Sequence, residues 1–76
     1  MIAVKFKEVD QSDSDDYVFI DKEGKSYHLF SDGRGSNIEG LSPDFWDKFY
    51  FSERIYIDYV ILKDEKKMIY RIISYT

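Results

Sequence analysis

The sequence predicts a mainly β domain with one short helix, in which a small five-stranded β-barrel has the order β-β-β-α-β-β and an OB-like architecture. Apolar and polar residues alternate in five stretches of the chain, as in strands that bury one face. Between the third and fourth stretches lies one segment with helix-start signals, the place that a helix takes in a five-stranded OB barrel. An SH3-like barrel or an open α+β sheet is the alternative.

The chain has 76 residues, which predicts one small β-barrel domain over residues 1–76. A domain of this size buries only about 60% of the surface that its unfolded chain exposes. There is no cysteine, so no disulfide supplements the core. Aromatic residues make up 18% of the chain, and we expect these rings and the isoleucines to supply most of the core.

The first strand is predicted at residues 2–9, where Ile2, Val4 and Phe6 fall on one face. Residues 10–16, DQSDSDD, have the polar composition of a solvated acidic loop. Oxygen ligands are dense there, but the sixth position holds Asp15 where an EF-hand loop requires glycine. We therefore expect a solvated loop and no metal site.

The second and third strands are predicted at residues 17–20 and 26–30, joined as a hairpin by DKEGK. A type I turn that starts at Asp21, with Gly24 in the left-handed conformation, fits a three-residue loop with a glycine bulge. The resulting pairs are Phe19 with Tyr27 and Tyr17 with Leu29. A two-residue turn at Glu23 and Gly24 is the alternative and changes the register.

The helix is predicted in LSPDFWDKFYF, residues 41–51. Ser42 can cap its start and Pro43 suits its first position, while Leu41 and Trp46 have the spacing of a hydrophobic staple. We expect about two turns, with Phe45 and Phe49 on one face and Trp46 in the core.

The last two strands, residues 54–62 and 68–75, are predicted to form a long hairpin around KDEKK. Pairing Leu62 with Met68 places Tyr59 opposite Arg71, which suggests a cation–π pair. The same register pairs Ile61 with Ile69, Ile57 with Ile73 and Ile55 with Tyr75. The other face is too apolar for solvent and either packs under another strand or forms a partner surface. Its apolar members are Tyr56, Val60, Leu62, Met68, Tyr70 and Ile72.

Residues 31–37, SDGRGSN, place Arg34 between two glycines, a composition found in turns and in anion-binding nests. The stretch has neither the dinucleotide-binding spacing nor the lysine of a P-loop. We interpret it as a turn that connects strand and helix, with Arg34 as a contact residue.

His28 is the single histidine. Both hairpin registers turn His28 and Phe30 away from the core-side pairs. A catalytic histidine usually needs a nucleophile and an orienting carboxylate, and no arrangement in the sequence supplies either. We interpret His28 as an exposed strand residue in an interface. We expect no enzymatic activity and no cofactor.

The formal net charge is −4, and the carboxylates concentrate in the first third of the chain. Nucleic-acid binding proteins normally carry a basic face, so nucleic acid is the less favoured partner. No export signal or membrane-spanning run is visible, which predicts a cytoplasmic protein that does not enter a membrane. Heavy use of Lys, Ile, Tyr and Asp is typical of AT-rich codons and suggests a bacterial or phage source.

These features predict a non-enzymatic protein-interaction module, which docks a protein partner or forms a homodimer through an aromatic strand face. The candidate partner-binding residues are His28, Phe30, Arg34, Tyr56 and Tyr70. One alternative is an OB-type reader of single-stranded nucleic acid that stacks bases on Phe30 beside Lys63, Lys66, Lys67 and Arg71. The other is an acidic decoy that inhibits a nucleic-acid-binding or defence protein through Asp13, Asp15 and Asp16.

Overall fold

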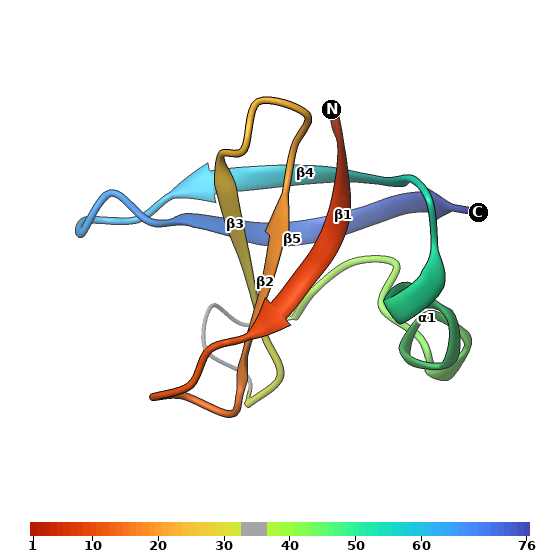
Figure 1. Cartoon of the computed structure of the whole chain (residues 1–76), viewed down its shortest axis with the longest axis horizontal. Helices are drawn as coiled ribbons and strands as arrows, with labels where there is room; N and C mark the ends of the chain where they lie inside the picture. Colours follow the sequence, from red (N-terminus) through yellow and green to blue (C-terminus); the bar gives the residue numbers. More distant parts are fainter. Residues whose placement is uncertain (33–36) are drawn as a thin grey trace.

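The computed structural model of the chain describes residues 1–32 and 37–76. Its elements follow the predicted order, with three strands, a helix and two further strands (Figure 1). The strands are β1 (Ile2–Val9), β2 (Asp16–Ile20), β3 (Ser26–Phe30), β4 (Ile55–Ile61) and β5 (Lys67–Tyr75). The helix α1 (Pro43–Lys48) continues into a short 3-10 helix, η1 (Phe49–Phe51).

The five-stranded sheet closes in a ring, with the order β1-β2-β3-β5-β4 and with β4 paired back to β1. Neighbouring strands are antiparallel, apart from β3 and β5, which are parallel and bring His28 opposite Met68. The pairing of β4 with β5 is the most extensive in the sheet. The turn of this hairpin lies at the opposite end of the molecule from α1 (Figure 1). No helix in the described ranges is long and apolar enough to cross a membrane.

The β2–β3 hairpin has the predicted three-residue loop. Tyr17 pairs with Leu29 and Phe19 with Tyr27, which confirms the register. Gly24 has a φ of 84°, and its N–H donates to the carbonyl of Asp21 over 3.0 Å. The register holds because Asp21 and Gly24 meet the local demands of this turn.

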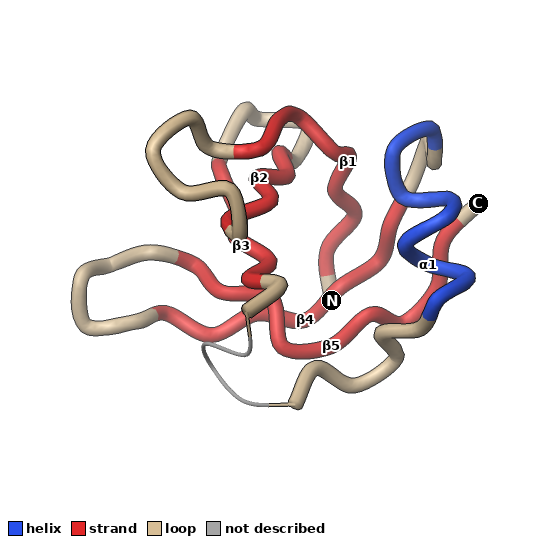
Figure 2. The backbone as a smooth tube through the Cα atoms, turned by 90° about the horizontal axis from the view of Figure 1, so that it is seen from below, coloured by secondary structure: helices blue, strands red, loops and turns tan. Residues whose placement is uncertain are grey.

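The helix start is also as predicted. Pro43 is the first helical residue, and the Ser42 hydroxyl accepts a hydrogen bond from the Phe45 N–H over 3.2 Å. Phe45 is fully buried, and its ring packs against those of Phe49 and Tyr75. Figure 2 accordingly shows α1 beside the C-terminal end of β5.

The register of the β4–β5 hairpin differs from the prediction. Ile55 pairs with Tyr75 as expected, but the register shifts twice, so that Tyr59 lies opposite Ile69. The two extra residues on β5, Tyr70 and Ile73, are β-bulges, and each one moves the following residues to the other face. The predicted pairs of Ile57 with Ile73, Ile61 with Ile69 and Leu62 with Met68 are therefore wrong.

The predicted contact between Tyr59 and Arg71 is wrong for the same reason. Arg71 lies opposite Asp58 and donates to its carboxylate over 3.1 Å. The guanidinium also donates to Glu39 over 3.1 Å and lies over the ring of Tyr70, 5.7 Å from its centroid. Arg71 thus joins β4, β5 and the segment before the helix.

The chain before α1 runs alongside β5 and adds to the sheet. The Glu39 N–H donates to the Tyr70 carbonyl over 3.0 Å, and the Ile72 N–H donates to the Glu39 carbonyl over 2.7 Å. Gly40 follows with a φ of 83°, and a Cβ atom there would lie 2.0 Å from the carbonyl oxygen of Ile72. Only glycine fits this close backbone approach without displacing β5.

The main core lies inside the ring and under α1. Its buried members are Val4, Phe19, Tyr27, Leu29, Phe45, Ile55, Ile57, Ile69 and Ile72. Trp46 is half-buried against this core, as predicted. Three further buried apolar residues, Val18, Phe30 and Met68, are not part of that cluster. The outer side of β2, β3 and β5 therefore carries a second, smaller apolar layer.

Candidate functional site

The strand face that carries His28 and Phe30 is not an open surface. Phe30 is buried, with 5% of its surface exposed, and the His28 ring stacks on it with centroids 6.1 Å apart. The expectation of an exposed aromatic strand face is therefore wrong at Phe30. The parallel pairing of β3 with β5 also places buried Met68 beside His28. On this face Phe30 is buried and His28 is half-buried.

His28 has an orienting carboxylate that the sequence did not reveal. Its Nδ1 lies 2.9 and 3.0 Å from the two carboxylate oxygens of Asp16, which is only 1% exposed. Asp16 was expected in the solvated loop, but it begins β2 and is buried. A buried carboxylate needs a donor, and the imidazole N–H supplies it.

A histidine held by a carboxylate provides two parts of a nucleophilic triad. In the described part of the chain, however, no serine, threonine or tyrosine hydroxyl forms a hydrogen bond to His28. The geometry is that of a buried carboxylate whose hydrogen-bonding capacity is met by a half-buried histidine.

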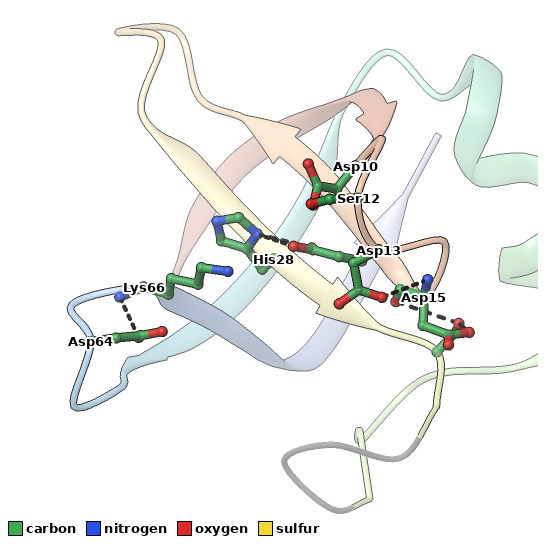
Figure 3. Close-up of polar contacts among 9 residues, drawn as sticks. Asp10, Ser12, Asp13, Asp15, His28, Asp64 and Lys66 are labelled. Atoms are coloured by element: carbon green, nitrogen blue, oxygen red, sulfur yellow. Dashed lines mark hydrogen bonds and ion pairs between the residues drawn. The ribbon is translucent and has the colours of Figure 1, made fainter.

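The acidic loop is ordered by its own carboxylates (Figure 3). The Asp13 carboxylate accepts from the Asp15 N–H over 3.1 Å, and the Ser12 hydroxyl donates to Asp10 over 2.8 Å. The Asp15 carboxylate accepts from the Ser31 hydroxyl over 2.9 Å, which ties the loop to the end of β3. These bonds hold the loop in one conformation beside the strand that carries His28.

The other three predicted partner-binding residues lie in different surroundings. Arg34 lies outside the described residues. Tyr70 is half-buried, with Arg71 over its ring. Tyr56 is half-buried and lines a groove, so it keeps a place on a candidate surface.

The groove that includes Tyr56 has a volume of about 640 Å³. It lies between the start of β1, the β2–β3 turn and the start of β4. Its lining residues are Ile2, Ala3, Val4, Lys5, Ile20, Asp21, Lys22, Glu23, Glu53, Arg54 and Tyr56. The groove is thus a concave surface that contains apolar side chains and charged side chains, and only some of the charged ones form ion pairs.

Asp21, one of the residues that line the groove, is the centre of a hydrogen-bond network. The Asp21 carboxylate accepts from the N–H groups of Glu23 and Lys25 and from the Tyr27 hydroxyl, all within 3.0 Å. Burial raises the pKa of Tyr27 to about 12, and the bond to Asp21 acts in the same direction. Burial also acts to raise the pKa of Asp21, but these hydrogen bonds outweigh it and hold that pKa below its usual value of 3.8.

Two exposed aromatic side chains were missed as site residues. Tyr50 and Phe51 in η1 are 72% and 70% exposed, whereas the preceding Phe49 packs against Phe45. The signal was present in the run Phe-Tyr-Phe, because a helical turn can direct only some of three consecutive rings toward the core. The Tyr50 ring still touches Phe6, with centroids 5.7 Å apart.

No metal site is evident, since the described residues contain no group of three or more His, Cys, Asp or Glu side chains placed to hold an ion. Comparisons of this chain with models of protein families, with curated proteins and with solved structures found no match. Functional inference therefore depends on the surfaces described above.

Proposed function

We propose that this protein is a non-enzymatic protein-interaction module built on an OB-like barrel. The ring of five strands, the parallel contact of β3 with β5 and the helix between β3 and β4 support the OB-like architecture over an open sheet. Such a scaffold hosts many functions, so the function is argued from its surface.

The exposed side chains of Tyr50 and Phe51, which are neighbours in the sequence, carry this proposal. Large aromatic side chains are enriched at the centres of protein interfaces, and two neighbouring ones left in water are uncommon on a surface without a partner. Charged residues in the same segment, including Asp47, Lys48 and Glu53, supply the polar rim that such interfaces have. The pair docks a protein partner or a second copy of the chain.

The double substitution Tyr50→Ser and Phe51→Ser tests this proposal. We expect self-association in analytical ultracentrifugation, or retention of a partner from lysate of the source organism, to be lost in this variant. The control is Ile73→Ser, which removes another exposed apolar side chain, 43% exposed, on β5. Thermal unfolding of both variants checks that the fold persists. A double variant that associates like the unmodified protein contradicts the proposal.

Binding of single-stranded nucleic acid is the second candidate, supported by the OB-like element order and by the exposed Lys63 and Lys66 in the β4–β5 turn. Burial of Phe30 removes the expected stacking ring, and the net charge of −4 opposes phosphate binding. The prediction is salt-dependent binding of a labelled oligonucleotide in fluorescence anisotropy. Absence of such binding removes this candidate.

The acidic decoy is the weakest of the three proposals. Of its three expected contact residues, Asp16 is buried against His28, and Asp15 holds Ser31. A decoy presents carboxylates to a basic partner, whereas these two serve the fold.

A further inference from the structure

Four aromatic rings from β1, β2, α1 and η1 contact the ring of Phe49. They belong to Phe6, Tyr17, Trp46 and Tyr50, and their centroids lie 4.9 to 6.5 Å from that of Phe49. The four also contact one another in a row, because the Phe6 ring lies 5.7 Å from Tyr50 and 6.2 Å from Tyr17. The row ends at Trp46, 5.1 Å from Tyr17. Tyr50 is exposed and the other three are half-buried, so we call these four residues the aromatic surface.

The aromatic surface also has hydrogen-bonding groups that the fold does not use. Within residues 1–32 and 37–76, neither the indole N–H of Trp46 nor the hydroxyl of Tyr17 forms a hydrogen bond. Every buried side-chain nitrogen and oxygen in those residues has a partner, so these two groups are open to water. The Tyr75 hydroxyl, by contrast, donates to the Asp44 carboxylate over 2.6 Å.

Ring faces beside unused donors suit a ligand that offers flat apolar groups and hydrogen-bond acceptors. The indole N–H can only donate, and a phenol hydroxyl can donate as well. A proline-rich segment in the polyproline II conformation has carbonyl groups without internal partners, and its prolines have no N–H. Aromatic side chains are the usual contacts of such segments. The nearby charges have both signs, as with exposed Lys7 and Asp47, so the rings and donors decide the class of ligand.

We propose that the aromatic surface binds a proline-rich segment of a partner protein in the polyproline II conformation. Proline rings pack between neighbouring aromatic rings, and carbonyl oxygens of the segment accept hydrogen bonds from Trp46 and Tyr17. Because polyproline II has three residues per turn, prolines three positions apart lie on one face and contact the surface together. This inference rests on the proposed function, because it includes Tyr50 and names the chemistry of the partner that docks there.

The test is selection from a displayed library of random peptides about nine residues long, which as polyproline II span roughly 28 Å. We expect enrichment of prolines three positions apart. An enriched peptide is then labelled and titrated with the protein in fluorescence anisotropy. A copy with alanine in place of both prolines should bind at least about tenfold more weakly, because it loses ring contacts and the preformed conformation. Trp46 is the single tryptophan of the chain, so binding should also change the emission of the unlabelled protein.

Conservative variants locate the site. Trp46→Phe and Tyr17→Phe each keep a ring and remove a donor, so the affinity should fall about threefold to tenfold, as expected for one lost hydrogen bond. Tyr70→Phe removes a hydroxyl outside the aromatic surface and should leave the affinity unchanged. Thermal unfolding of the three variants checks that the fold persists. The inference is overturned if prolines are not enriched, if the alanine copy binds equally well, or if the three variants behave alike.

The Tyr50→Ser and Phe51→Ser double variant separates failure of this inference from failure of the proposed function. If no proline-rich peptide is enriched but this variant loses self-association or partner retention, only the present inference fails. If the variant associates and binds an enriched peptide like the unmodified protein, the proposed function fails and this inference fails with it. Loss of both association and peptide binding in this variant supports both.

Discussion

At the scale of single residues, the buried pair of Asp16 and His28 is the feature most dependent on its surroundings. The Asp16 side chain is only 1% exposed, and the Nδ1 atom of His28 lies 2.9 Å from its carboxylate. The two residues are 12 positions apart, so their contact joins the end of the acidic loop to β3. The pair also shows that a histidine beside a carboxylate can be structural.

Removal of one member of this pair should be costly. We expect His28→Ala or Asp16→Ala to lower the free energy of unfolding by about 3 kcal/mol, measured by urea denaturation. The double variant should lose less than the sum of the single losses, because neither buried group is then left alone. Additive losses would show that the two side chains do not interact energetically.

The raised pKa of Tyr27 predicts that the folded state loses stability at alkaline pH. Its pKa is raised from 10.0 to about 12, so the folded state holds the phenol proton more tightly than the unfolded state does. The stabilising contribution is complete below pH 10 and is lost as the pH rises through about 12.

Urea midpoints measured between pH 9 and pH 12 check this prediction. A Tyr27→Phe variant should show a shallower alkaline decline, whereas Tyr70→Phe should decline like the unmodified protein. If the Tyr27→Phe variant declines just as steeply, the alkaline loss comes from other groups.

At the scale of elements, the segment before α1 depends on one glycine. Gly40 combines a positive φ with a backbone approach that leaves no room for a Cβ atom. Gly24 also has a positive φ, but a Cβ atom there would meet nothing within 4 Å. Substitution of each glycine by alanine therefore separates the cost of the backbone conformation from the cost of a steric clash.

We expect Gly40→Ala to lower the free energy of unfolding by more than about 2 kcal/mol, because it adds a steric clash to the backbone strain. Gly24→Ala should cost about 1 kcal/mol from strain alone. Chemical denaturation of both variants gives the comparison. Equal losses would indicate that the Ile72 carbonyl moves away at little cost.

At the scale of the whole molecule, the closed ring leaves two separate features at its surface, the exposed side chains of Tyr50 and Phe51 and the groove beside β1. They differ in chemistry, because the first is aromatic, whereas the second is concave and contains three basic and three acidic residues beside its apolar ones. On the strand face expected to bind partners, Phe30 is buried and His28 lies against the Asp16 carboxylate. Function is therefore proposed at surfaces that the closure of the sheet leaves open.

The sequence by itself determined the order of elements, the Asp21–Gly24 turn with its register, and the start of the helix at Ser42. These features depend on groups within a few positions of one another, so local patterns contain the necessary information. Of the candidate site, it identified only Tyr56 in the groove, although the run of three rings at Phe49 also held a signal for Tyr50 and Phe51.

Only the tertiary structure decided the two bulges in β5, the burial of Asp16 and Phe30, and the groove beside β1. Each results from contacts between segments far apart in the chain, above all the pairing of β3 with β5 and of β1 with β4. Alternation along a strand shows which residues share a face. It does not show whether another strand, a loop or water covers that face, because burial is a property of the packed ring.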